Sequence, residues 1–211
     1  SGNIGLTSEK VLLKDYLLTW LENVSRPQVK RSTSLSYAYH ITHNINPYIG
    51  DIVLQELRPR DCADLMKKLV DRGLHRSTLS TTRNVLSSAL KYAIYPAEII
   101  ITNAAANITI PKNVTDTSQV KRTVISSEQI QAILHDWPFG SKLYMPILIS
   151  YHTGMRISEV LGLEWDAIDF TAKTIHVRQG QCFSRAARRS YLDTPKTKKS
   201  DRLVLIDTGL L

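Results

Sequence analysis

The spacing of apolar residues changes once along this chain, and that change limits the folds the chain can adopt. In the first half apolar side chains recur every three to four positions, as between Val11 and Leu21, which is the period of an amphipathic helix. From Lys173 the period becomes two, as in Thr174–Val177, which is the alternation of a half-buried strand. The sequence therefore predicts a mainly α first part followed by an α+β second part.

Four helices with short connections are predicted in the first part. Their apolar stripes run over residues 7–23, 33–46, 60–72 and 77–95. Pro47, Gly73 and Pro96 follow the last three stripes and are expected to end those helices, because proline cannot continue a helix and glycine favours its end. We therefore expect a compact helical domain over residues 1–110.

A polar stretch separates this domain from the rest of the chain. The segment PKNVTDTSQVK has no hydrophobic period and is typical of a linker, which we place at residues 111–122. Beyond it, Ser126 and Gln129 form a capping-box pattern for a helix to about His135. Residues 144–151 predict a buried apolar helix, and a further helix is expected to end near Leu163.

The remaining residues predict a small three-stranded antiparallel sheet. Its strands are expected at residues 174–177, 189–194 and 203–206, with a turn through residues 196–200. Three short strands on two or three helices make a thin core. We therefore expect residues 123–211 to be the N-terminal part of a larger domain.

Charge and composition limit the partners. The 211 residues include 27 Lys and Arg against 19 Asp and Glu, and the net charge of +8 favours polyanions such as DNA, RNA or an anionic membrane surface. The alternative is a soluble protein that happens to be basic. No apolar run approaches the roughly 20 residues of a membrane span, and the first residues lack the features of a secretory signal. We expect a cytoplasmic protein without a membrane partner.

The two cysteines give no sign of a metal site, and a structural disulfide between them is the alternative to two free thiols. Cys62 and Cys182 are far apart in the sequence and have no partners at metal-ligand spacing. Two free thiols in a reducing compartment, with no metal and no cofactor, are the expected state.

The segment HTGMRISEV, residues 152–160, places a charged side chain at the start of an otherwise apolar helix. Arg156 and Glu159 are three residues apart and share a helix face. Thr153-Gly154 resembles a helix start, and Gly154 would allow close approach of a backbone. Outward-pointing amides, a planar guanidinium and a carboxylate that holds it would bind an anion, most naturally phosphate. The alternative is an exposed Arg–Glu pair that contributes almost nothing.

A second signal is the basic run between Arg178 and Arg202. It holds eight basic residues against two acidic ones, a net +6, with Phe183 and Tyr191 interleaved. A solvated turn usually explains such a run. Here it follows the helix of Arg156 directly, where a bound polyanion would continue.

These residues resemble a known family. The stretch YHTGMRISEVLGLEWDAIDF, followed by an expected strand pair and then TPKTKKSDRLVLI, resembles the tyrosine recombinases of the phage-integrase family. The integrases of conjugative transposons and temperate phages are the nearest in pattern. The first part resembles the family's helical core-binding domain, although Asn103-Ala104 stands where the family usually has Asn-Pro. The resemblance implies a core-binding domain followed by the N-terminal half of a tyrosine-recombinase catalytic domain.

The resemblance also implies a mechanism. In this family a tyrosine hydroxyl attacks a DNA phosphodiester, leaving a 3′-phosphotyrosyl link and a free 5′-hydroxyl, without ATP, metal or cofactor. Arg156 matches the arginine that holds a non-bridging oxygen, and Lys196 matches the lysine that protonates the departing 5′-oxygen. Glu159 matches the acidic residue that orients the arginine. Cations aimed at the transition state would stabilise its added negative charge.

The family's other catalytic residues, including the nucleophilic tyrosine, lie downstream of the small sheet. None of the nine tyrosines of this sequence matches the nucleophile's position. We therefore expect the 211-residue polypeptide to be part of an enzyme about half again as long, with a natural truncation as the alternative, and to bind DNA without cleaving it. A non-catalytic DNA-binding protein and a type IB topoisomerase-like enzyme are the alternatives.

The expected partner is double-stranded DNA with inverted core sites. The family assembles as a homotetramer in synapsis, is monomeric or dimeric off DNA, and can use accessory DNA-bending proteins. Residues expected to contact DNA lie on the second and fourth predicted helices, in the linker and in the basic run: Thr33, Ser34, Tyr37, His40, Thr78, Thr81, Thr82, Arg83, Lys91, Lys112, Lys121, Arg122, Arg178, Arg185 and Lys198.

Overall fold

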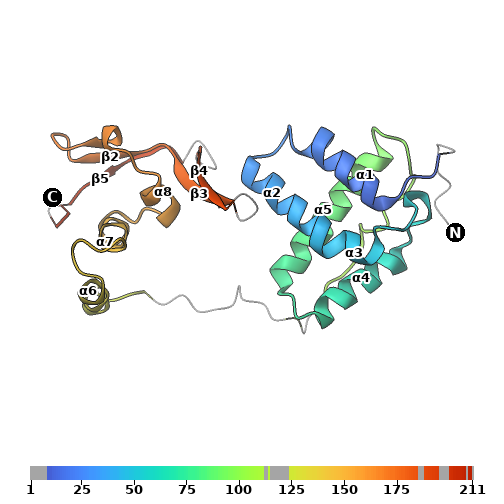
Figure 1. Ribbon diagram of the computed structural model, residues 1–211, viewed down its shortest axis with the longest axis horizontal. Coiled ribbons are helices and arrows are strands. Elements are labelled where there is room, and N and C mark those ends of the chain that lie inside the picture. Colours follow the sequence, from blue (N-terminus) through green and yellow to red (C-terminus); the bar gives the residue numbers. More distant parts are fainter. Residues whose placement is uncertain are drawn as a thin grey trace. The chain divides into compact units, whose positions relative to one another are not determined.

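A computed structural model describes residues 9–111, 114, 124–184, 188–194, 200–207 and 209–210. The chain divides into two compact units, Ser1–Lys121 and Arg122–Leu211, called unit 1 and unit 2 below (Figure 1). The predicted linker, residues 111–122, lies almost wholly outside the described residues and stays a prediction.

The regular secondary structure described in unit 1 is helical, apart from an isolated β-bridge between Leu12 and Val53. Its α-helices are α1 (Leu13–Trp20), α2 (Arg31–His40), α3 (Asn46–Ile49), α4 (Pro59–Asp71) and α5 (Arg76–Ile94). Single π-helical turns, Leu21–Ser25 and Ile41–Ile45, continue α1 and α2, and a 3₁₀ turn, Leu54–Glu56, precedes α4. The four predicted helices are confirmed as α1, α2, α4 and α5.

The sequence pattern predicted that Pro47 ends the second helix, and this is wrong. The chain continues from α2 through a π-helical turn into α3, and Pro47 occupies the first turn of α3. Proline is tolerated there because the first N–H groups of a helix have no intrahelical acceptor. Gly73, by contrast, follows α4 with φ of +80°, as expected of a helix-ending glycine.

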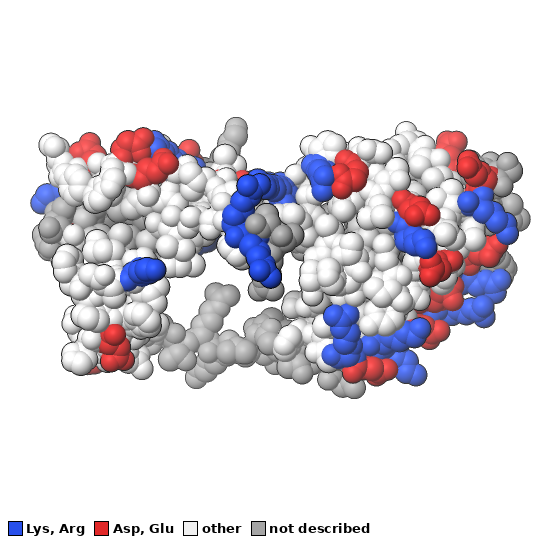
Figure 2. Space-filling model, in the orientation of Figure 1, with Lys and Arg blue, Asp and Glu red and all other residues white. Residues whose placement is uncertain are grey.

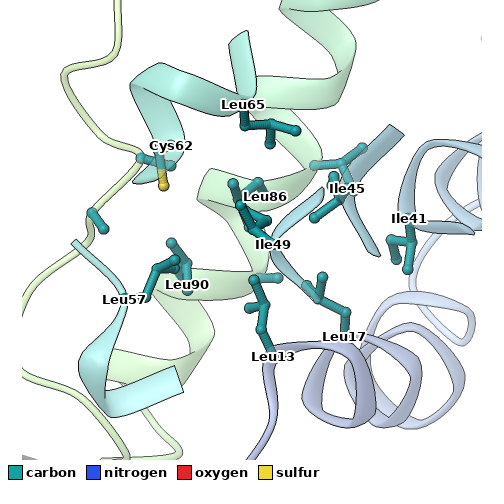
Figure 3. Packing of buried hydrophobic residues seen from close by; sticks show 14 of the residues in the cluster. Leu13, Leu17, Ile41, Ile45, Ile49, Leu57, Cys62, Leu65, Leu86 and Leu90 are labelled. Carbon is teal, nitrogen blue, oxygen red and sulfur yellow. The ribbon is translucent and has the colours of Figure 1, made fainter. Parts of the chain in front are cut away.

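Helix α5 supplies the centre of the unit 1 core. Figure 3 shows Leu86 and Leu90 of α5 among leucine and isoleucine side chains from the other helices. Full burial of one such side chain stabilises a fold by about 1.5–3 kcal/mol. The buried residues of α5 are Leu79, Thr82, Val85, Leu86, Ala89, Leu90 and Ala93.

A buried polar cluster lies beside these apolar side chains. The Nδ1 atom of His40 is 2.8 Å from Oγ1 of Thr82, and the side-chain amide of Asn44 donates to the same hydroxyl at 3.3 Å. The Thr82 hydroxyl also bonds the carbonyl of Thr78 at 2.9 Å. Burial lowers the pKa of His40, which favours the neutral ring.

In its described residues, unit 2 combines three short α-helices with two small antiparallel sheets. Its elements are α6 (Ser127–Asp136), α7 (Tyr144–Thr153), α8 (Ile157–Leu161), a 3₁₀ turn (Trp165–Ala167), β1 (Ile168–Asp169), β2 (Thr174–Val177), β3 (Gly180–Ser184), β4 (Arg189–Asp193) and β5 (Arg202–Leu205). The predicted capping box is confirmed, because the Ser126 hydroxyl accepts from the amide of Gln129. The predicted fold class, helices followed by an α+β part with a small antiparallel sheet, is also confirmed.

The membership of the sheet differs from the prediction. A three-stranded sheet is present, but its order is β1-β2-β5, and the strand predicted at residues 189–194 pairs with β3 in a separate hairpin. The two sides of β2 are taken by β1 and β5, so β4 pairs instead with the strand before it. The two-residue strand β1 is too short to show a period in the sequence.

Helix α7 was predicted to be buried, and this is wrong. None of its side chains is fully buried, and Met145 and Tyr151 are 45% and 46% exposed. Together with Trp165 and Phe170, Met145 lines an open apolar cavity of about 430 Å³ beside the sheet. The described part of unit 2 therefore leaves α7 partly exposed.

Two glycines allow α8 to pack closely against β3. A Cβ atom added to Gly162, just after α8, would lie 2.8 Å from the Cα atom of Gly180 and from the backbone nitrogen of Gln181. The side-chain amide of Gln179 also donates to the Gly162 carbonyl at 2.9 Å. Backbone lies against backbone here, so no side chain fits.

No helix among the described residues is both long and apolar enough to cross a bilayer.

We predict that Gly162→Ala destabilises unit 2. Gly162 has an ordinary φ of −96°, so relief of glycine's conformational entropy alone would stabilise the protein by about 0.4–1 kcal/mol. The contact of the new methyl group with the β3 backbone should reverse that sign and cost about 1–3 kcal/mol. Hydrogen exchange of the α8 and β3 amides measures the effect, with α5 as the internal control. Unchanged or slower exchange in α8 would contradict the packing described.

Candidate active site

Arg156 lies immediately before α8, and a hydrogen bond from its backbone amide to the Glu159 side chain holds it there. Its φ and ψ of −68° and 147° are extended, so the helix begins at Ile157. The Arg156 amide donates to Oε2 of Glu159 at 2.9 Å, which satisfies a backbone donor that the helix leaves free. The predicted helix start therefore lies at Arg156 and not at Thr153-Gly154.

Gly154 has a different role from the predicted one. It ends α7 with φ of +63°, and its amide donates to the carbonyl of Ser150 at 3.0 Å. No atom lies within 4 Å of an added Cβ, so glycine is not needed for close approach of a backbone. It is favoured because other residues rarely adopt a positive φ.

The carboxylate of Glu159 is the centre of the site. The residue is 8% exposed and accepts hydrogen bonds from two arginines. Oε1 accepts from Nη1 of Arg156 at 2.9 Å and from Nη1 of Arg202 at 3.3 Å. Oε2 accepts from the Arg156 amide and from Nη2 of Arg202 at 3.0 Å. The predicted Arg156–Glu159 pair is therefore present, as part of a larger cluster.

These contacts keep Glu159 ionised. Burial alone would raise the pKa of its carboxyl group, but the hydrogen bonds from Arg202 and from the amide and guanidinium of Arg156, with the charge of Arg202, lower it to about 2. One negative charge is thus shared by two positive ones. The cluster carries a net charge of about +1.

Arg156 presents most of its guanidinium to solvent. Its side chain is 69% exposed, and only Nη1 is engaged by Glu159. Within the described part of the chain no acceptor contacts Nε or Nη2. An arginine held by one nitrogen, with its other donors directed outwards, is suited to bind an oxyanion.

The contact between Arg202 and Glu159 was not predicted from the sequence. Arg202 was seen only as a member of the basic run, although it begins β5, where Val204 is partly buried two residues later. Alternation along a strand puts residues two apart on the same face. Val177, which pairs with Arg202 across the sheet, is buried, so this signal could have placed Arg202 towards α8.

Lys196, the predicted proton donor, lies outside the described residues, and its convergence with Arg156 stays a prediction. Of the residues after it, Ser200 and Asp201 are described and lie near the cluster. Asp201 accepts from Nε2 of His176 on β2 at 2.7 Å, and the Ser200 carbonyl accepts from Arg202 at 3.2 Å.

The DNA-contact residues predicted on α2 and α5 fall into two groups. Ser34, His40 and Thr82 are buried, with 4%, 7% and 0% exposure, and so belong to the interior and not to a contact surface. The others have solvent-accessible surface: Thr33, Tyr37, Thr78, Thr81, Arg83 and Lys91.

Three accessible members of this set have protein partners, and one of them is Thr81, whose hydroxyl donates to the Ser77 carbonyl at 3.0 Å. Tyr37 stacks on Trp20 with ring centroids 6.2 Å apart, and Arg83 donates to the carbonyl of Ile108 at 3.2 Å. Figure 2 shows basic and acidic side chains next to one another on the face of unit 1 that it draws. The charge on that face is mixed.

In unit 2, Arg178 is held by two carboxylates. Its Nη2 atom is 3.0 Å from Oε2 of Glu164 and 2.6 Å from Oδ1 of Asp166. Its charge is therefore largely balanced by protein groups. The other predicted contacts, Lys112, Lys121, Arg122, Arg185 and Lys198, lie outside the described residues. Among the described residues no group of three His, Cys, Asp or Glu side chains is placed to hold a metal ion, and Cys62 and Cys182 are free thiols.

Two family models match the sequence. The N-terminal SAM-like domain of phage integrases matches residues 12–70, in unit 1, and the phage integrase family matches residues 123–202, which include Arg156, Glu159 and Arg202. Together they cover more than half of the chain. The chain belongs to the phage integrase family, the tyrosine recombinases.

Similar curated proteins include recombinases and transposases. The chain is 28% identical to a "Tyrosine recombinase XerC-like" protein of Caldanaerobacter subterraneus, over 100% of this chain and 56% of that protein. It is 26% identical to the transposase from transposon Tn916 of Enterococcus faecalis, over 87% of this chain and 45% of that protein. The chain thus spans about half the length of the curated relatives it matches.

Solved integrase structures share the fold. The Tn1549 transposon integrase in complex with transposon right end DNA matches with a TM-score of 0.75 and 21% identity, over 95% of this chain and 62% of that chain. A lambda integrase tetramer bound to a Holliday junction matches with a TM-score of 0.67 and 18% identity, over 89% of this chain and 50% of that chain.

We predict that Glu159→Gln destabilises unit 2 and removes an acid-sensitive part of its stability. The pKa of Glu159 is lowered from 4.5 to about 2 on folding, so its stabilising effect is full above pH 4.5 and is lost as the pH falls towards 2. At pH 7 the substitution should cost about 1–3 kcal/mol. Denaturant unfolding of unit 2 at several pH values measures both effects.

Glu164→Gln is the matched control, because Glu164 also pairs with an arginine but its side chain is 50% exposed. Its cost should stay below about 1 kcal/mol. Equal costs for the two substitutions would contradict the central role of Glu159.

Proposed function

We propose that this chain forms the DNA-binding part and the first half of the catalytic site of a site-specific DNA recombinase from a mobile element. The observation that carries the proposal is Arg156, whose exposed guanidinium is held by a buried carboxylate inside the segment that matches the phage integrase family. The cluster's net positive charge and the outward donors suit a phosphate group.

Arg156 would hold a non-bridging oxygen of the phosphodiester at which a DNA strand is cut. In the reaction we propose, a tyrosine hydroxyl attacks phosphorus, the 5′-oxygen leaves with a proton from Lys196, and a 3′-phosphotyrosyl link remains. The reverse attack by a 5′-hydroxyl rejoins the strand. A cation already aimed at the phosphate oxygens lowers the barrier, because negative charge on them increases in the transition state.

We further propose that unit 1 grips the duplex through α2 and α5, with Lys91, Thr33, Thr78 and Thr81 at or near phosphates and Arg83 at a guanine edge. Double-stranded DNA with inverted core sites is the proposed partner, and a homotetramer is the proposed state in synapsis, with monomers or dimers off DNA. Support comes from relatives: solved structures of similar integrases contain DNA, including lambda integrase as a dimer and as a tetramer. Such a partner would place the protein at the bacterial nucleoid in the cytoplasm, with DNA-bending proteins as accessories.

We predict that the chain binds duplex DNA with an affinity that falls steeply with salt. Each neutralised phosphate contributes about −0.9 to the slope of log K against log salt, so several contacts should give a slope of about −3 or steeper. Fluorescence anisotropy with a 30-base-pair duplex (about three helical turns) at a series of NaCl concentrations measures it.

Within that experiment, Lys91→Ala should make the slope shallower by about one. Lys14→Ala is the matched control, because Lys14 is already paired with Asp51 at 2.7 Å and should leave the slope unchanged. A slope near zero for the wild-type chain would refute DNA binding through phosphate contacts.

The 211-residue polypeptide is predicted to bind DNA without forming a covalent link to it. Nicked duplexes with randomised cores are incubated with the chain and separated on a denaturing gel, with an active tyrosine recombinase on its own nicked site as the positive control. We expect no shifted protein–DNA band. A band that resists denaturation and disappears after protease treatment would show that a tyrosine of this chain attacks DNA.

A further inference from the structure

Arg202 is a charged residue of the cluster that the proposed mechanism leaves without a task. Its Nη2 and Nη1 atoms bond Oε2 and Oε1 of Glu159 at 3.0 and 3.3 Å, which is a two-point contact between a planar guanidinium and a carboxylate. Nη1 also donates to the Ser200 carbonyl at 3.2 Å. Both terminal nitrogens of Arg202 are therefore directed at protein acceptors.

Arg156 and Arg202 differ in what they present to solvent. The Arg156 side chain is 69% exposed and gives one nitrogen to Glu159, whereas the Arg202 side chain is 32% exposed and gives two. A ligand that approaches from solvent meets Arg156 first. Arg202 lies behind the carboxylate, where it can act on that ligand through Glu159.

Arg202 can affect Arg156 because both arginines compete for the carboxylate of Glu159. Glu159 has two oxygens, and each already accepts one bond from Arg202 and one from Arg156. Without Arg202, the freed acceptor positions would draw further donors of Arg156 inwards. The remaining Arg156–Glu159 pair would also be neutral, so an anion would meet no net charge.

We propose that Arg202 is a positioning residue of this site: it occupies and neutralises Glu159, so that Arg156 keeps its outer donors and its charge for a phosphate oxygen. The inference rests on the proposed function, because it takes Arg156 as the phosphate ligand. Its location also fits the task, since β5 carries Arg202 to the helix start that carries Arg156.

The test uses the 211-residue chain and inorganic phosphate as the probe. The Nε–H signal of Arg156, assigned by its loss in Arg156→Lys, is followed by NMR while phosphate is added. Arg202→Met, which keeps an unbranched side chain but removes the charge and the donors, should raise the apparent Kd about three- to tenfold. Arg202→Lys keeps the charge but makes one contact in place of two, so it should give an intermediate Kd.

The second arm separates positioning from direct contact. In a Glu159→Gln background no carboxylate competes for Arg156, so Arg202→Met should raise the Kd through its lost charge alone, and therefore less than it does in the wild-type background. An equal weakening in both backgrounds would mean that Arg202 contacts phosphate itself and would overturn the proposal. Lys142→Met, at an exposed lysine of unit 2, is the control and should leave the Kd unchanged.

Other outcomes distinguish a failure of positioning by Arg202 from a failure of the phosphate site at Arg156. If wild-type Arg156 responds to phosphate and Arg202→Met responds with the same Kd, positioning by Arg202 is wrong while the phosphate site stands. If wild-type Arg156 does not respond at all, the phosphate site itself fails. Should Arg202→Met not fold by circular dichroism, Arg202→Lys in both backgrounds carries the test, and a wild-type Kd there overturns positioning.

Discussion

The shared carboxylate of Glu159 is the interaction on which the organisation of unit 2 depends. It joins two parts of the chain: the start of α8, through the backbone amide and the guanidinium of Arg156, and β5, through Arg202. Burying a carboxylate is costly unless its lone pairs are satisfied by charged donors. Here two guanidiniums and one amide satisfy them, so the ion can remain in a nearly closed position. Removal of any one partner would leave the others less well balanced.

This cluster contributes strongly to the stability of unit 2 because the apolar core among the described residues of unit 2 is small. Its buried apolar cluster is Met155, Val160, Ile175, Val177 and Ile206, whereas that of unit 1 contains 24 residues. Unit 1 is therefore held by burial around α5. In unit 2 the close contact of Gly162 with β3 and the ion cluster at Glu159 join α8 to the sheets. A charged site at such a joint both holds the fold together and presents a cation.

The helices could be predicted from the sequence because each one repeats its signal. In α5 a 19-residue helix shows the apolar period several times over, and its face and end followed from it. Single positions were less secure: Ser34, His40 and Thr82 were assigned to the surface, although a short polar side chain at the edge of an apolar stripe can be buried if it finds a partner. Strand partners could not be predicted, because alternation marks a strand but does not name its neighbour. For the same reason Arg156 and Glu159, three residues apart, were recognised, but the third member of their cluster, Arg202, lies 43 residues beyond Glu159 and only the fold brings it there.

The division of labour between the two arginines has a consequence for any anion that binds and leaves repeatedly. The desolvation of Glu159 and the ordering of Arg202 take place when unit 2 folds, not when the anion arrives. An incoming phosphate oxygen then needs to displace water only from the exposed donors of one guanidinium, whose direction is already set. Because this ordering is complete before binding, its free-energy cost does not weaken the affinity for the anion. In a reaction, the same cost does not add to the activation barrier. A buried carboxylate between two arginines is therefore a means of keeping one of them both rigid and free.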